Sequence, residues 1–119
     1  MKTVFELAVG KGVPDSKILK EMQRRLTKHF LGTIILAELR NESFLGGYDL
    51  VELIHKKFGF LMSPGTVYSC LYLMERQGLV KGGFTEGKRT YILTEKGLDA
   101  INFISKSKEA ILRFIGTLF

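Results

Sequence analysis

Residues 63–93 read SPGTVYSCLYLMERQGLVKGGFTEGKRTYIL, and the spacing of apolar residues changes at Gly78 within this stretch. Before the glycine, Val67, Leu71 and Met74 recur every three or four positions, which places them on one face of a helix. After the glycine, β-branched and aromatic residues gather in short runs instead. The stretch therefore predicts a helix followed by β structure.

The ends of these elements carry their own signals. Ser63 and Pro64 are typical of a helix start, because serine can cap free N–H groups and proline suits the first helical position. Residues 79–81 and 90–93 are the two β-prone runs, and the loop expected between them contains Gly82, Gly83 and Gly87. We predict a two-stranded hairpin here.

Two more helices are expected before this stretch, on either side of a turn at 41–47. Residues 30–39 are apolar almost all the way round, which is typical of a helix buried on more than one side. A shorter helix is expected from about 48 to 58, with Gly59 as a left-handed cap. Its apolar face consists of Leu50, Val51, Ile54 and Phe58.

The N-terminal part predicts a basic amphipathic helix. Asp15 or Ser16 can cap its start, and Gly32 predicts a bend between it and the apolar helix that follows.

Residues 94–119 predict a final helix of about 25 residues, which corresponds to about 37 Å at 1.5 Å per residue. Such a helix is longer than a small domain can easily cover, and its apolar stripe is wide. We therefore predict a homodimer interface made by Leu98, Ile101, Ile104, Ile111, Ile115 and Leu118. The alternative is one long helix packed on its own core.

Helices followed by a hairpin and a last helix give the outline of a winged helix-turn-helix. The expected fold class is mainly α with a small β-hairpin, an extra N-terminal helix and a long C-terminal dimerisation helix. We divide the chain into a basic helical extension (1–25), a winged helix-turn-helix domain (26–93) and a dimerisation helix (94–119).

In this fold the helix at about 63–77 enters the major groove, and the wing at about 79–93 lies on the backbone or minor groove. Gly65, Ser69, Tyr72 and Arg76 lie opposite the apolar face of the helix. Their hydroxyl, phenol and guanidinium groups suit base edges and phosphates. A solvated helix face and a hydrophilic turn are the plainer interpretations of the helix and the wing tip.

Several segments resemble the PadR family of transcriptional regulators and occur in the family's order. They are FLGTI (30–34), GYDL (47–50), SPGTVY (63–68), ERQGLV (75–80) and RTYILTEKG (89–97). The resemblance covers roughly residues 26–119. The basic helix before it is an extension beyond the family's usual start, with three possible roles: contact with DNA, support of a dimer, or cover for the core. Leu73 departs from the resemblance, since the family often has a basic or polar residue at that position.

The resemblance implies a regulator, usually a repressor, that dimerises through its last helix and in some members responds to a small hydrophobic effector. It also implies that Tyr68, Lys88 and Arg89 face DNA. We predict a homodimer that binds double-stranded DNA, and the alternative is a winged-helix protein-interaction module that binds an acidic partner. The candidate DNA-binding residues are Ser63, Gly65, Thr66, Tyr68, Ser69, Tyr72, Arg76, Lys88, Arg89 and Thr90.

Composition agrees with this interpretation. The 119 residues fit one compact domain, and a net charge of +6 favours polyanionic partners. The single cysteine, Cys70, suits a reducing compartment. No apolar run has the length of a membrane span, so a soluble, cytoplasmic protein without membrane contact is expected.

An enzyme is not expected, and neither is a metal or cofactor site. His29 and His55, the two histidines, are far apart and form no metal-spaced set with Cys70. The glycines of the hairpin do not precede a helix, as a phosphate-binding loop requires. Cys70 lies beside the apolar face of its helix, where a small buried thiol is the expected role.

Overall fold

Two helices form the N-terminal part of the computed structural model, which describes residues 17–119. Helix α2 (Lys17–His29) is followed directly by α3 (Leu31–Asn41). The predicted start at Asp15 or Ser16 lies outside the described residues. The bend predicted at Gly32 lies instead at Phe30, because Gly32 is inside α3. There it faces α5, with Met74 Sδ 3.7 Å from where a Cβ would stand.

The helix-turn-helix consists of α4 (Gly47–Phe58) and α5 (Pro64–Arg76). Gly59 has φ +84° and ends α4 in the left-handed conformation, as predicted. Pro64 occupies the first turn of α5, but the Ser63 side chain makes no capping bond. The Ser63 carbonyl instead accepts hydrogen bonds from the N–H groups of the first turn.

The sheet is larger than the predicted hairpin. Strands β2 (Val80–Thr85) and β3 (Lys88–Leu93) pair in antiparallel register, and β1 (Leu45–Gly46), which we expected as a turn, pairs with the other side of β3. Gly82 and Gly83 lie within β2 and not in a loop. The turn is Glu86-Gly87, and both residues have positive φ, 52° and 77°. This matches the turn type whose twist suits a two-residue hairpin loop.

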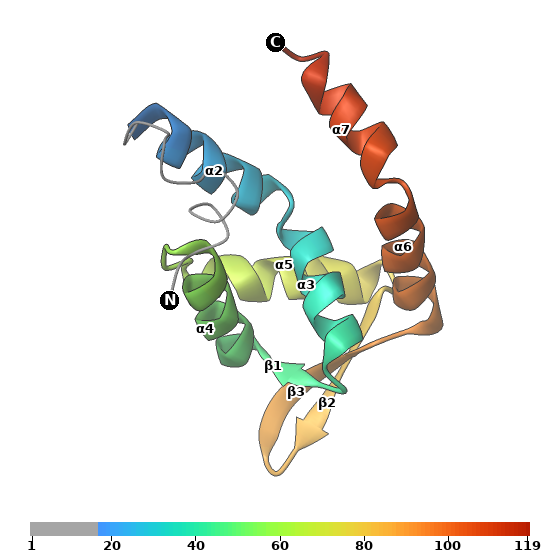
Figure 1. The fold of residues 1–119 in the computed structure, drawn as a ribbon. Helices are drawn as coiled ribbons and strands as arrows, with labels where there is room; N and C mark the ends of the chain where they lie inside the picture. The colour runs from blue at the N-terminus through green and yellow to red at the C-terminus, as the bar shows by residue number, and fades with distance from the viewer. Residues whose placement is uncertain (1–16) are drawn as a thin grey trace.

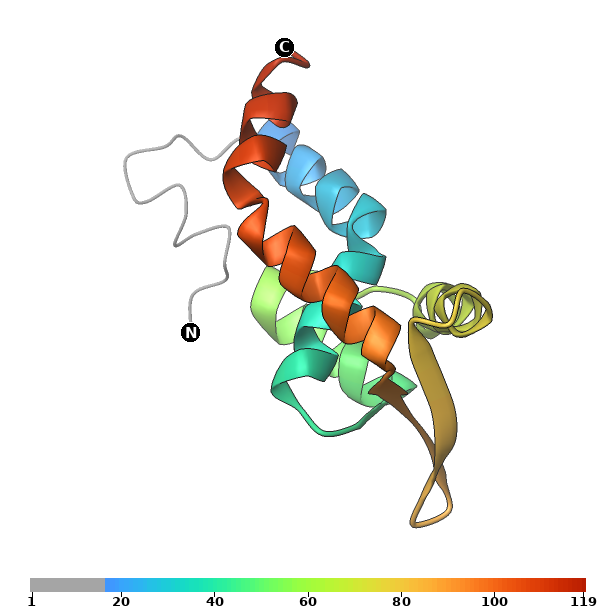
Figure 2. The same ribbon diagram turned by 90° about the vertical axis from the view of Figure 1, so that its right-hand side faces the viewer.

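The core lies where α3 crosses α5 and α6 (Figures 1 and 2). Apolar faces predicted from spacing are buried here, with Leu50, Val67 and Leu71 fully enclosed. Tyr91 of β3 also belongs to the core, so the wing is attached to the helices at its base. The mainly helical fold class with a small sheet, a winged helix-turn-helix, is confirmed.

The C-terminal region is two helices and not one. Helix α6 (Glu95–Lys106) packs on α3, and α7 (Lys108–Gly116) begins after a break at Ser107. Thr94 caps α6 by accepting a hydrogen bond from Gly97 N–H. Helix α7 projects away from the core and has no buried residue (Figures 1 and 2). No helix in residues 17–119 has the length and apolarity required to cross a bilayer.

Candidate nucleic-acid interface

Helix α5 separates its two faces as the sequence predicted. Val67 and Leu71 are fully buried, whereas Ser69, Tyr72 and Arg76 are exposed on the opposite side. The Arg76 guanidinium lies 5.8 Å from the centroid of the Tyr72 ring. Three further candidates at the N-terminal end of the helix are also largely exposed: Ser63, Gly65 and Thr66. The outer face of α5 can therefore reach a partner without any change in the core.

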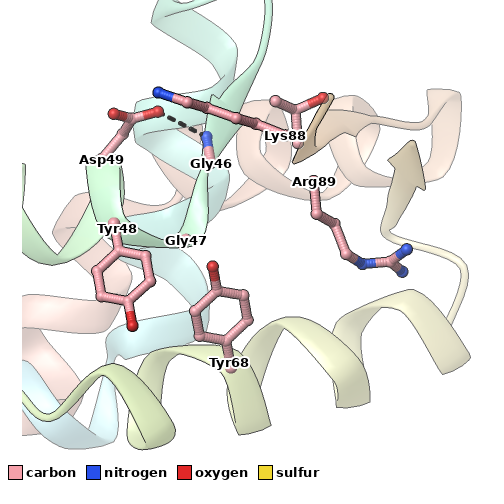
Figure 3. Close-up of a pocket in the computed structure, with 8 residues that line it drawn as sticks. Gly46, Gly47, Tyr48, Asp49, Tyr68, Lys88 and Arg89 are labelled. Atoms are coloured by element: carbon pink, nitrogen blue, oxygen red, sulfur yellow. Dashed lines mark hydrogen bonds between the residues drawn. The ribbon is translucent and has the colours of Figure 1, made fainter. Parts of the chain in front are cut away.

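A pocket of about 350 Å³ lies between the N-terminal end of α4, α5 and the wing (Figure 3). Its lining combines phenol, ammonium and guanidinium groups with two glycines and one carboxylate: Gly46, Gly47, Tyr48, Asp49, Tyr68, Lys88, Arg89 and Thr90. Four of these, Gly46 to Asp49, were not among the predicted site residues. Gly47, Tyr48 and Asp49 belong to the GYDL motif (47–50) already noted in the sequence, and Gly46 precedes it, but only the fold shows that this segment lies opposite Tyr68.

Tyr68 is a half-buried wall of this pocket. Its ring meets that of Tyr48 edge to face, with centroids 5.9 Å apart, and lies directly over Gly47 (Figure 3). A Cβ at Gly47 would overlap the Tyr68 ring and stand 2.6 Å from its hydroxyl. Burial, and then the nearby phenol of Tyr91, raise the pKa of Tyr68, so its hydroxyl is a neutral donor at physiological pH.

Gly47→Ala should therefore displace Tyr68 and collapse the pocket. Overpacking of this kind costs about 1–3 kcal/mol of unfolding free energy. Thermal denaturation should show a lower midpoint, and the near-ultraviolet circular dichroism of the tyrosines should change. Gly83→Ala is the matched control, because its new Cβ would meet no atom within 4 Å. Equal behaviour of the two variants would show that Tyr68 is not fixed by Gly47.

The charged groups of the pocket lie on different sides. Asp49 Oδ2 accepts a hydrogen bond from Gly46 N–H at 2.8 Å, so the first turn of α4 has its own carboxylate cap. Lys88 extends across the pocket toward α4, whereas Arg89 points toward α5 (Figure 3). The hydroxyls of Tyr48 and Tyr68 and the Lys88 ammonium form a surface suited to a phosphate, with the Asp49 carboxylate restricting where an anion can sit.

Arg89, which the resemblance predicts to face DNA, is exposed but already hydrogen-bonded within its own chain. Its Nη2 donates to Glu75 Oε1 at 3.2 Å and its Nε to the Tyr91 hydroxyl at 3.1 Å. The hydrogen bond to Tyr91, and secondarily the carboxylate of Glu75, raise the pKa of Arg89. Thr90, another predicted DNA contact, is buried, and its hydroxyl bonds to that of Thr85. Its hydroxyl therefore bonds within the wing, although the residue also lines the pocket.

A second surface is an apolar groove of about 660 Å³ between α2 and α7. Its lining is Met22, Leu26, Phe30, Ala110, Ile111, Phe114, Ile115, Leu118 and Phe119. The sequence predicted Ile111, Ile115 and Leu118 for a dimer interface, but it did not assign the α2 residues to it. Ile101 is 2% exposed and packs in the core of its own chain, which makes its predicted place in that interface wrong. Ile104 also packs partly against that core.

Cys70 is half-buried on α5, with its Sγ 3.7 Å from Met74 Sδ. Burial raises the pKa of its thiol, so the reactive thiolate is disfavoured at neutral pH. Within residues 17–119, no three His, Cys, Asp or Glu side chains gather in a group that could hold a metal ion.

Residues 35–102 match the model of the transcriptional regulator PadR-like family. A PadR family transcriptional regulator from Eggerthella lenta is similar in structure, with a TM-score of 0.70 and 24% identity over 85% of this chain and 91% of that one. A PadR-like transcriptional regulator from Bacillus cereus has a TM-score of 0.65 and 25% identity over 79% and 95% of the two chains.

Bacillus subtilis PadR, solved in complex with operator DNA, has a TM-score of 0.53 and 24% identity. The similarity covers 60% of this chain and 44% of that one. No curated protein sequence matches the chain. These relatives are described as transcriptional regulators and not as enzymes.

Proposed function

Because the chain belongs to the transcriptional regulator PadR-like family, we propose that it regulates transcription by binding duplex DNA as a homodimer. The observation that carries this proposal is the polar outer face of α5 beside the pocket that contains Lys88. Ser69 and Tyr72 contact base edges in the major groove, and Arg76 contacts a base or a phosphate. Lys88 contacts the backbone from the wing.

In this proposal residues 26–93 bind DNA and the C-terminal region, 94–119, forms the two-fold interface. The apolar groove between α2 and α7 is the surface that each protomer contributes to that interface. Exposed apolar side chains along α7, with Leu112 and Phe114 each 66% exposed, favour a second copy as the occupant. The resemblance to the PadR family implies a repressor, and we propose that role for the dimer.

Replacing the outer face of α5 should reduce sequence discrimination. Ser69→Ala, Tyr72→Ala and Arg76→Ala remove groups that lie away from the core, so all three variants should fold. At least one should lose about 1–3 kcal/mol more on the selected operator than on a scrambled duplex, the range for one base contact. The operator is first obtained by selection from a random duplex pool, and affinities are measured by fluorescence anisotropy.

Lys106→Ala is the control for this series, since it removes an exposed group from α6, which belongs neither to the outer face of α5 nor to the pocket that contains Lys88. Equal losses on both duplexes from all three folded variants would mean that α5 does not read sequence. No salt-dependent duplex binding by the unmodified protein would contradict the proposal itself. The alternative, a protein-interaction module for an acidic partner, would then take its place.

A further inference from the structure

Glu75, near the end of α5, uses both carboxylate oxygens to hold the wing. Oε2 accepts a hydrogen bond from Gly82 N–H on β2 at 2.9 Å. Oε1 accepts one from Arg89 Nη2 on β3 at 3.2 Å. One side chain of α5 therefore holds both strands of the hairpin, through hydrogen bonds whose acceptor is a charged carboxylate.

The backbone of the wing is shaped for this contact. A Cβ at Gly82 would stand 2.8 Å from Glu75 Oε2 and 2.6 Å from Arg89 Nη2. A side chain here would displace the ends of Glu75 and Arg89, so glycine at this position lets the ion pair lie against β2. Val80, two residues earlier, is 2% exposed, so the wing is anchored at its base and again at Gly82.

Arg89 and Lys88 are adjacent but have different surroundings. The Arg89 guanidinium lies 5.4 Å from the ring centroid of Tyr91 and 5.9 Å from that of Phe84, in addition to its bonds to Glu75 and the Tyr91 hydroxyl. Lys88 has no ion-pair partner within residues 17–119 and lines the pocket. Arg89 also lines the pocket and its side chain is 43% exposed, but its charge is already paired with Glu75, so of the two wing cations only Lys88 has no ion pair among the described residues.

We infer that Glu75 is a positioning residue that fixes the wing on the recognition helix and withholds Arg89 from DNA phosphates. This role depends on the proposed binding of duplex DNA. Phosphate contacts carry no sequence information, so a free arginine on the wing would strengthen binding to every duplex alike. With Arg89 paired to Glu75 and the wing held in one position, binding to other duplexes gains less. The operator is then favoured over them, because only there do Lys88 and α5 make their contacts together.

The test is the slope of the logarithm of the DNA association constant against the logarithm of the salt concentration. This slope steepens by about one for each phosphate that the protein neutralises. Lys88→Ala should reduce the slope by about one, and Arg89→Ala should leave it unchanged. Glu75→Gln should make the slope steeper by about one, because Arg89 is released, and should narrow the affinity ratio between operator and scrambled duplex. The double variant Glu75→Gln, Arg89→Ala should return the slope to the value of the unmodified protein.

Glu86→Gln is the matched control, since it removes the same charge from the wing turn but does not contact Arg89. The salt slope of this control should be less steep than that of Glu75→Gln. Thermal denaturation shows that each variant is folded. A slope reduced by Arg89→Ala as much as by Lys88→Ala would overturn the inference and leave DNA binding intact. Unfolding of Glu75→Gln would leave the comparison of Arg89→Ala with Lys88→Ala as the deciding result. A protein without salt-dependent duplex binding would instead refute the proposed function.

Discussion

Ile111→Asp combined with Ile115→Asp should convert the proposed dimer into monomers. Both side chains line the apolar groove between α2 and α7, and in a two-fold interface each new carboxylate occurs twice. An unpaired charge in an apolar interface costs several kcal/mol. Since about 1.4 kcal/mol corresponds to a tenfold change in Kd, dimer affinity should fall more than a thousandfold. Light scattering over a concentration series measures the change, and operator affinity should fall with it because the half-sites are then bound separately.

Arg113→Asp provides the control, since it also places an aspartate on α7, but at an exposed position outside the groove. It should leave the dimer intact. Far-ultraviolet circular dichroism should show that the double variant keeps the fold, because α7 has no residue buried in the core. A double variant with an unchanged mass at micromolar concentration would refute the assignment of this groove to the partner chain.

Gly97→Ala should destabilise the protein more than Gly47→Ala does. Gly97 is buried in the first turn of α6, and an added Cβ would overlap the backbone carbonyl oxygen of Leu79. That oxygen accepts a hydrogen bond from Thr94 N–H at 3.2 Å, and Leu93 Cδ2 would lie 3.1 Å from the new Cβ. Backbone cannot yield as a flexible side chain does, so the loss should reach about 3 kcal/mol, the upper end for overpacking.

A loss of that size corresponds to a fall in Tm of roughly 10–20 °C for a domain of this length. Thermal denaturation should be compared at one protein concentration, since a dimer's Tm depends on it. Gly116→Ala is the control, because no atom lies within 4 Å of its new Cβ. It should keep or slightly raise the Tm, as alanine favours a helix. A Gly97→Ala protein that melts with the control would show that α6 can shift away from Leu79.

Local signals in the sequence were sufficient for most of the helical fold. The apolar spacing of Val67, Leu71 and Met74 identified the buried face of α5, and the same spacing identified that of α4. Gly59 and Gly78 marked helix ends because both adopt positive φ, which glycine adopts without strain. These features depend on neighbouring residues alone, and such features can be read from a single sequence.

Features that depend on distant residues could not be predicted. Strand β1 has two residues, too few for any period, and exists because β3 offers a free edge. Nothing in the sequence pairs Arg89 with Glu75, fourteen positions earlier, because only the approach of the wing to α5 brings them together. Ile101 continues the apolar stripe of the C-terminal region, but packing of α6 on α3 buries it in its own chain.

The break at Ser107 fixes the angle between α6 and α7. Backbone hydrogen bonds continue through the bend, from Ser107 N–H to Ile104 and from Ile111 N–H to Ser107. On one side Arg40 ties α6 to α3, and on the other side α7 lines the groove. In the proposed dimer the angle between α6 and α7 would set the distance between the two copies of α5, which must match half-sites about 34 Å apart for one DNA turn. Substitutions at this bend would retune the protein to differently spaced operators while every base-reading side chain stayed the same.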